Sequence, residues 1–323
     1  MNATRAVSSP ALRRILAAME PSRPLPLRSL AETTGLSPST VARAVAELTA
    51  WGILAEDEGT DPVSGRPCRV IFPAPVAILP VLAVSETHGQ VIATDLTAHT
   101  LGTASVELDP ALPPEEGLRL LCRRAMPLLR GCAAATGLSV CAPILLTDRG
   151  ETYAAEAVTD AVTDAVGLPP LMSVGYGEAV AAALPCQPIS PKAASLLHIH
   201  GGDRRVILLT GQEGEDWRVS PLGRRLSQAL ARYTDGAGSP DALRKGAARF
   251  LQELCGFLSP DCILAEDPTG MLPSPEEARL LLPDGTAWIR RETDEGGIPL
   301  AALGALILGR RRLWEKILSE RTR

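Results

Sequence analysis

Aromatic residues are scarce in this sequence: Phe, Trp and Tyr together make up 3% of its 323 residues. Proteins that hold single-stranded nucleic acid stack its bases on aromatic side chains, so this scarcity argues against that class of protein. The interior must instead be built mainly from Ala, Leu and Val. Apolar residues reach 46% and charged residues 21%, which is typical of a globular chain rather than a disordered one.

Closely spaced cysteine pairs are absent as well. The seven cysteines are scattered, odd in number and never arranged as Cys-x-x-Cys. This pattern argues against a disulfide framework and against a structural zinc site. We therefore expect reduced, mostly buried thiols in a cytoplasmic protein, with no bound metal and no cofactor.

The sequence also lacks a long hydrophobic run. Its most apolar tract, at 74–84, is too short to cross a bilayer and is interrupted by Pro80. Residues 1–21 carry arginines within their apolar pattern and lack the uninterrupted apolar stretch of a secretion signal. We expect neither a membrane segment nor secretion.

What the sequence does have is a helix-turn-helix pattern near its start. Apolar residues at helical spacing predict one helix over 9–20 and another over 27–34. Gly35 permits a tight turn, Ser37 is a favourable N-cap, and Pro38 suits the first position of a third helix that runs to about residue 51. Strands at 53–59 and 67–73, joined by a turn at 60–66, complete a winged helix-turn-helix domain over residues 1–72.

The third helix and the wing predict the surface that meets DNA. Burial of Val41, Val45 and Leu48 leaves small residues on the open face, where hydroxyl and backbone N–H groups can approach phosphates or base edges. Arg43 can reach a guanine edge or a phosphate, and an extended Arg at the wing tip suits a narrow minor groove. The predicted DNA-binding residues are Arg28, Ser37, Ser39, Thr40, Arg43, Gly65, Arg66 and Pro67.

The charge of this domain limits how tightly one copy can bind. Residues 1–72 hold eight Arg, no Lys and seven Asp or Glu, a net charge of +1 within a chain of net charge −5. A module of that charge has modest affinity for phosphates, so we expect two protomers to bind one roughly palindromic site of double-stranded DNA, as a homodimer or a dimer of dimers. The alternative is that the winged helix docks another protein.

A second domain follows a proline-rich segment. Prolines in "FPAPVAILP" predict a linker over 73–80, and residues 81–323 alternate strand-like and helical runs, which indicates an α/β domain. Strands are expected at about 81–84, 90–94, 102–107, 138–146 and 261–265, with a hairpin from "ASLLHIH" and "RVILLTG"; helices are expected at 115–134, 179–185, 242–258 and 298–319.

This order of parts resembles the ROK family of transcriptional repressors and sugar kinases. The resemblance is strong across residues 27–72, which include "GLSPSTVARAVAELTAWGIL" (35–54) and "SGRP" (64–67). It is weaker in "VGYGEAVAAAL" (174–184) and "GGIPLAALGALILG" (296–309). It implies an actin-like (hexokinase-like) domain of two lobes, at about 81–190 and 191–323.

Departures from the family pattern argue against catalysis. The Asp-x-Gly-x-Thr phosphate loop of the family's kinases has no counterpart in "VLAVSETHGQVIATDL", and the Gly-Thr-Gly hairpin is replaced by "HGGDRR", where Asp203 would repel phosphate. The family's catalytic Asp aligns with Tyr176 and its sugar-binding Asn with Gly175, and a phenol is a poor base at neutral pH. The family's zinc signature is missing. We therefore expect no catalytic residues and no enzyme activity, a sugar kinase being the alternative.

The altered cleft still has candidate effector-binding residues. Tyr176 and Glu178 could line it, and His198 and His200 share one face of a strand. Two histidines so placed could bind a metal, but no cysteine lies close by, which favours hydrogen-bonding imidazoles. The arginines of "RRETDEGG" and "GRRRLWEKI" are expected to form a solvated helix end, with Leu313 and Trp314 packing inward.

Together these patterns predict a DNA-binding transcriptional regulator, acting as a repressor, whose catalytically dead ROK-like domain serves dimerisation and effector binding. Whether that domain binds a small molecule is open.

Overall fold

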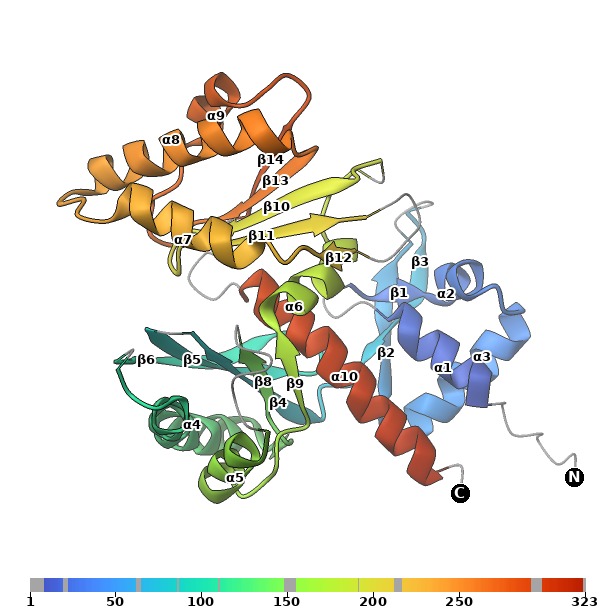
Figure 1. Ribbon diagram of the computed structural model, residues 1–323. Helices are drawn as coiled ribbons and strands as arrows, with labels where there is room; N and C mark the ends of the chain where they lie inside the picture. The colour runs from blue at the N-terminus through green and yellow to red at the C-terminus, as the bar shows by residue number, and fades with distance from the viewer. Residues whose placement is uncertain are drawn as a thin grey trace, which may run out of the picture. The chain divides into compact units, whose positions relative to one another are not determined.

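The protein forms two compact units in a computed structural model (Figure 1). One unit comprises Met1–Val174 and Ala305–Arg323, and the other comprises Gly175–Gly304. The structure describes residues 9–19, 23–61, 65–85, 87–109, 111–147, 155–190, 192–211, 217–291 and 298–321. This division differs from the expected lobes, because the second unit begins before residue 190 and the end of the chain belongs to the first.

The N-terminal part of the first unit is a winged helix-turn-helix, as predicted. Its elements are α1 (Ser9–Ala18), β1 (Leu25–Pro26), α2 (Leu27–Thr34), α3 (Pro38–Ala50), β2 (Leu54–Thr60) and β3 (Pro67–Pro73). The strands form an antiparallel sheet in the order β1-β3-β2. Gly35 ends α2 with a φ of +64°, a conformation that favours glycine.

The last helix of the chain completes the core of this winged helix. Helix α10 (Leu300–Arg321) contributes Trp314 and Leu318 to a cluster that includes Leu12 of α1, Val45 of α3 and Ile71 of β3. Trp314 is 2% exposed, which agrees with its predicted inward packing, whereas Leu313 is half-buried. Residues almost the full length of the sequence apart therefore share one hydrophobic core.

Arg310 of α10 is buried, and its expected solvation is wrong. Its side chain is 1% exposed, its Nη1 donates to the carbonyl of Leu96 at 3.1 Å and its Nη2 donates to the carbonyl of Met19 at 2.6 Å. Its guanidinium carbon lies 4.6 Å from the centre of a Trp314 ring. A guanidinium is tolerated in such a place because backbone carbonyls and the aromatic face replace part of its hydration. Arg311 and Arg312, by contrast, are exposed.

The remainder of the first unit is a mixed sheet covered by helices. Its strands are β4 (Ala77–Val84), β5 (His88–Asp95), β6 (Thr100–Glu107), β7 (Ser139–Val140), β8 (Ile144–Thr147) and β9 (Met172–Gly175), in the order β6-β5-β4-β8-β9 with β7 paired to β4. Helices α4 (Pro114–Thr136) and α5 (Ala155–Val166) pack on this sheet (Figure 1). Strand β4 begins at Ala77, inside the segment 73–80 that was expected to be a linker. Pro80 does not prevent the strand, because a proline can occupy a strand where its missing N–H is not needed.

The second unit is a five-stranded sheet with helices α7 and α8 packed against it. The strands are β10 (Ser195–His200), β11 (Arg205–Thr210), β12 (Arg218–Val219), β13 (Cys262–Glu266) and β14 (Ala287–Arg291), in the order β12-β11-β10-β13-β14. The helices are α6 (Tyr176–Ala183), a short 3-10 turn (Leu184–Cys186), α7 (Gly223–Thr234), α8 (Pro240–Leu258) and α9 (Pro275–Leu281). Arg290 and Arg291 therefore end a strand rather than a helix, and residues 292–297 of "RRETDEGG" lie outside the described residues.

All seven cysteines are free thiols, four of them buried. In the part of the chain that the structure describes, no helix combines the length and apolar character that a membrane span needs.

Replacement of Trp314 tests the shared core. Trp314→Ala should lower the free energy of unfolding of the winged helix by roughly 3–5 kcal/mol, because it removes a large buried side chain and leaves a cavity. Denaturant unfolding, followed by amide exchange in α1 and α3, measures this loss. Lys316→Ala, an exposed change two residues along the same helix, should shift it by at most about 0.5 kcal/mol. A loss below about 1 kcal/mol for Trp314→Ala would show that the winged helix does not need α10.

Candidate functional site

Helix α3 presents a face of small side chains with one arginine. Val41, Val45 and Leu48 are buried, as the pattern predicts. The residues left exposed along the helix are Pro38, Ser39, Ala42, Arg43, Ala46 and Ala50, with Thr40 half-buried. Alanines at intervals of four residues stand on one side of a helix, so the backbone can approach another surface closely there.

The N-terminal tip of α3 is a hydroxyl cluster. Ser37 is the N-cap: its Oγ accepts from the backbone N–H of Thr40 at 3.2 Å and lies 3.1 Å from the Oγ of Ser39 and 2.8 Å from the Oγ1 of Thr40. Pro38 occupies the first helical position, where a missing N–H is not needed. Exposed hydroxyls at the positive end of a helix dipole form a surface suited to phosphate.

Arg28, on α2, forms an ion pair with Glu32 of the same helix. Its Nε donates to Glu32 Oε1 at 2.9 Å, and the two side chains are 78% and 63% exposed. An ion pair this exposed contributes little free energy, so Arg28 can leave Glu32 for a phosphate. Among the described residues, Arg43 has no ion pair, and it is the more available cation of the two.

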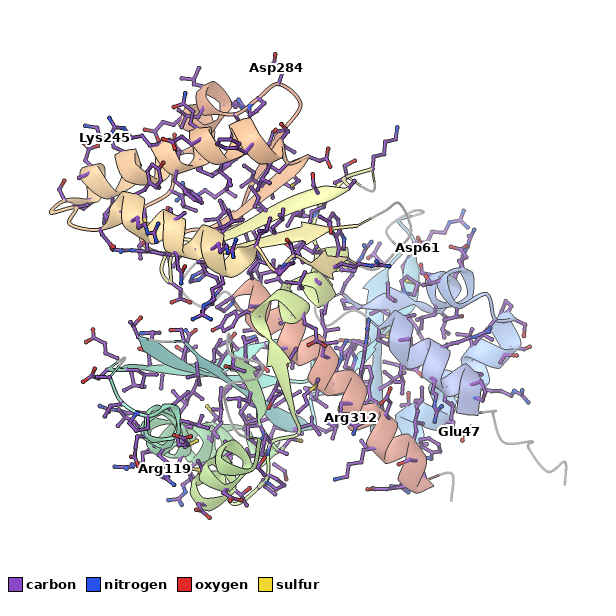
Figure 2. All side chains as sticks on the ribbon, viewed as in Figure 1. Glu47, Asp61, Arg119, Lys245, Asp284 and Arg312 are labelled. Carbon is purple, nitrogen blue, oxygen red and sulfur yellow. The ribbon has the colours of Figure 1, made fainter. Side chains whose placement is uncertain are left out.

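Two of the predicted contact residues of the wing, Gly65 and Arg66, bind the backbone of Asp61 across its end. The N–H of Gly65 donates to the carbonyl of Asp61 at 2.8 Å, and the N–H of Asp61 donates to the carbonyl of Arg66 at 2.9 Å. Gly65 has a φ of +67°, and Arg66 and Pro67 are exposed. Figure 2 labels Asp61 at this end of the wing. Residues 62–64, including Ser64 of the predicted tip, lie outside the described residues.

Strand β2 is acidic, a feature that the sequence reading did not use. Glu56, Asp57 and Glu58 follow one another on β2 and are exposed, and Arg69 of β3 binds Glu56 at 3.2 Å. These carboxylates oppose the approach of phosphates along that strand. The cation of the wing that is best placed for DNA is therefore Arg66, at its end.

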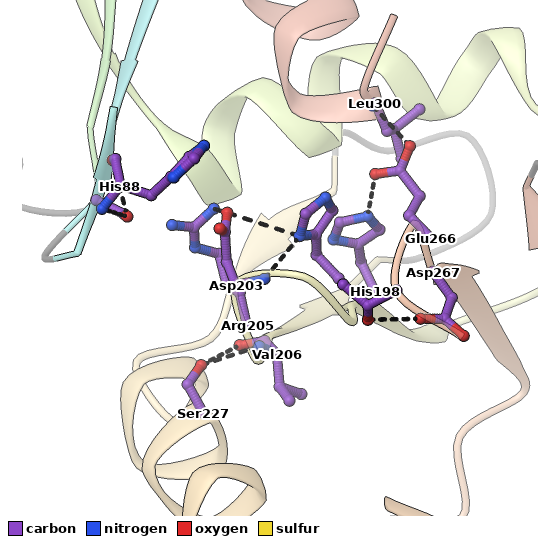
Figure 3. Close-up of polar contacts among 12 residues, drawn as sticks. His88, His198, Asp203, Arg205, Val206, Ser227, Glu266, Asp267 and Leu300 are labelled. Atoms are coloured by element: carbon purple, nitrogen blue, oxygen red, sulfur yellow. Dashed lines mark hydrogen bonds and ion pairs between the residues drawn. The ribbon is translucent and has the colours of Figure 1, made fainter. Parts of the chain in front are cut away.

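The predicted effector residues of the second unit lie in separate local settings. Tyr176 begins α6, and the guanidinium carbon of Arg205 lies 3.5 Å from the centre of its ring. Arg205 is 7% exposed and its Nη1 donates to Asp203 Oδ2 at 3.2 Å (Figure 3). Glu178, one turn into α6, is exposed.

His198 belongs to a buried polar cluster centred on Glu266. His198 Nε2 donates to Glu266 Oε2 at 2.9 Å, and the two side chains are 2% and 1% exposed. Glu266 Oε1 accepts from the backbone N–H of Leu300 at 2.8 Å (Figure 3). The same oxygen also binds Arg291. Burial alone would raise the pKa of Glu266, but the hydrogen bond from His198 and the charge of Arg291 outweigh it and hold that pKa at about 2.

His200 has a different partner from His198. Its Nδ1 accepts from the backbone N–H of Asp203 at 3.2 Å, and burial lowers the pKa of its imidazole despite the nearby carboxylates. A neutral ring is what this accepting role requires. The part of the chain that the structure describes contains no group of three His, Cys, Asp or Glu side chains able to hold a metal ion.

Sequence reasoning missed Arg205, Glu266 and Arg291. Arg205 begins and Glu266 ends an apolar strand, "RVILLT" and "CILAE", which is the signal that could have found those two. Their partners come from other strands, so the pairing itself was not readable from spacing.

Comparison with known proteins bears on both parts of the chain. Residues 13–58 match the model of the IclR helix-turn-helix domain. This range runs from α1 into β2, so these residues form a helix-turn-helix domain. A search of curated proteins found no match.

Solved structures that are similar to this chain include a ROK family transcriptional regulator, a homologue of the E. coli MLC protein. It superposes with a TM-score of 0.57 at 14% identity, over 95% of this chain and 98% of that one. A ROK family glucokinase from Streptomyces griseus matches with a TM-score of 0.47 at 14% identity, over 73% of this chain and 100% of that one. An inorganic polyphosphate/ATP-glucomannokinase from Arthrobacter sp. strain KM matches with a TM-score of 0.48 at 14% identity, over 72% of this chain and 98% of that one. The likeness to the regulator confirms the predicted fold, a winged helix followed by an actin-like α/β domain.

The depressed pKa of Glu266 predicts how stability depends on pH. The Glu266 carboxylate binds a proton less readily in the folded state than in the unfolded state, where its pKa is near the ordinary 4.5. The contribution of Glu266 is therefore fully present above that value and is lost as the pH falls through about 2. Glu266→Gln should remove this contribution. Between pH 4.5 and about 2, the free energy of unfolding of the wild-type protein should therefore fall further than that of the variant, by on the order of 3 kcal/mol. Denaturant unfolding of both proteins at several pH values measures this, and parallel curves would contradict the assignment.

Proposed function

We propose that this protein is a sequence-specific DNA-binding transcriptional regulator that acts as a repressor. The observation that carries the proposal is the exposed face of α3, where a hydroxyl-rich tip is followed by small residues around Arg43. This face belongs to the residues that match a helix-turn-helix domain. In such domains the second helix of the motif enters the major groove and reads base edges.

The side chains of α3 suit particular groups on DNA. Arg43 can donate two hydrogen bonds to the O6 and N7 of a guanine, and the methyl groups of Ala42 and Ala46 can contact thymine methyls. The hydroxyls of Ser37, Ser39 and Thr40 would meet phosphates at the helix N-terminus. Arg66 would enter the neighbouring minor groove, as extended arginines at a wing do.

Two copies of the chain are needed for tight binding. The winged helix carries a net charge of only +1, and the acidic strand β2 keeps the count of phosphate contacts low. A homodimer, or a dimer of dimers, would place two α3 helices in successive major grooves of an inverted repeat. Dimerisation is the role we assign to the α/β part of the chain.

The α/β part is proposed to have lost catalysis and to serve as a regulatory domain. Tyr176 is stacked against Arg205 where a kinase of this fold would need a base, and Asp203 adds a carboxylate close by. A small-molecule effector would have to be recognised by groups other than a catalytic Asn-Asp pair.

Replacement of Arg43 and Arg66 tests the DNA-reading surface. Arg43→Ala should lower discrimination at one base pair by about 1–3 kcal/mol, because a bidentate contact to guanine is lost. Arg66→Ala should weaken binding chiefly where the flanks are A·T-rich, because a narrow minor groove attracts arginine. Selection of random duplexes at about 100 mM salt, with sequencing of those retained, measures both effects.

Arg119→Ala is the matched control, since it removes the same charge from the exposed surface of α4, outside the winged helix. It should retain the wild-type sequence preference. If Arg43→Ala and Arg66→Ala also select the wild-type motif with unchanged affinity, the recognition surface lies elsewhere.

A further inference from the structure

Glu266 joins three strands of the second unit to the start of α10. It ends β13, and the parallel registers place it opposite His200 of β10 and Arg291 of β14. Both of its carboxylate oxygens are engaged: Oε2 with His198, and Oε1 with Arg291 and the N–H of Leu300. With 1% of the side chain exposed, water cannot readily replace these bonds.

The bond to Leu300 anchors the first turn of α10. The first N–H groups of a helix have no acceptor within the helix, and a carboxylate there satisfies one of them and favours the helix dipole. Gly304, one turn further on, lies so close to the carbonyl of Ala179 on α6 that a Cβ at this position would overlap it. Within the second unit, α10 is therefore held by a charged hydrogen bond and by a close backbone contact.

The same helix is anchored again in the winged helix. Trp314 and Leu318 lie in its core, and Arg310 donates to the carbonyl of Met19, just after α1. Helix α10 runs without interruption from Leu300 to Arg321, so the anchored first turn and the winged-helix contacts belong to one helix with no loop between them.

We propose that Glu266 is a positioning residue for DNA binding. By fixing the first turn of α10 to the sheet of the second unit, it fixes the helix that completes the winged-helix core, and with it the recognition helix α3. A ligand that draws His198 or Arg291 away from Glu266 would act on the winged helix through the same route. The DNA-binding consequence rests on the proposed function, whereas the coupling between Glu266 and the winged-helix core does not.

The test compares Glu266→Gln with Leu251→Ala in the full-length chain. Gln keeps the size of the side chain but removes its charge. Leu251, 1% exposed on α8, lies in the core of the same unit, so its truncation destabilises that unit without removing the anchor of α10. Hydrogen exchange of backbone amides, resolved by segment, and affinity for a duplex recovered by selection are measured for both variants.

We expect Glu266→Gln to speed exchange at least tenfold in the first turns of α10 and also in α1 and α3, and to weaken binding to the selected duplex at least fivefold. Leu251→Ala should speed exchange in the helices of the second unit alone and keep affinity within twofold. Arg291→Met leaves the bond to Leu300 but loosens the carboxylate, so it should show the pattern of Glu266→Gln at smaller size and serves if that variant fails to fold.

Two outcomes would overturn the proposal. In one, the amides of Glu266→Gln and Arg291→Met exchange faster only at the first turn of α10, and exchange in α3 is unchanged. In the other, Leu251→Ala affects α3 and affinity as strongly as they do, which would reduce the effect to general stability. If the wild-type protein selects no duplex, the proposed function fails, and exchange in α1 and α3 still decides whether Glu266 is coupled to the winged helix.

Discussion

The insertion of Trp314 and Leu318 into the winged helix is the interaction on which the rest of the structure depends. A domain of about seventy residues buries a limited apolar area and is correspondingly marginal. Here the large indole of α10 fills the centre of that small core, beside Leu12, Val45 and Ile71. The surface proposed to read DNA thus depends for its rigidity on a helix that begins in the other compact unit.

Buried charge meets that helix at its first residue and again near its middle, for the same physical reason. Arg310 and Glu266 would each carry a large desolvation cost if unpartnered, so each is surrounded by groups that replace water: carbonyls and a ring for Arg310, donors from three directions for Glu266. Such clusters tolerate few alternative arrangements. They give α10 a defined position where an apolar contact alone would allow sliding.

The winged helix could be predicted from the sequence because its signals are local. The glycine at 35, the Ser-Pro start of α3 and its apolar spacing specify a turn, a cap and a buried face within twenty residues, and the structure has each of them. The sequence did not reveal that Arg310 is buried, that Arg291 ends a strand and pairs with Glu266, or that the ring of Tyr176 is covered by Arg205. Those outcomes depend on partners distant in sequence, and an arginine in a basic run is most often solvated.

We propose that α3 reads duplex DNA, while the α/β part pairs two chains and governs the winged helix through α10. The DNA-reading role is tested most directly by exposing the purified protein to a genomic fragment library at about 100 mM salt and sequencing what is retained. We expect enrichment of one inverted-repeat motif whose half-sites lie one or a few helical turns apart. Retention of fragments without any common sequence would contradict it.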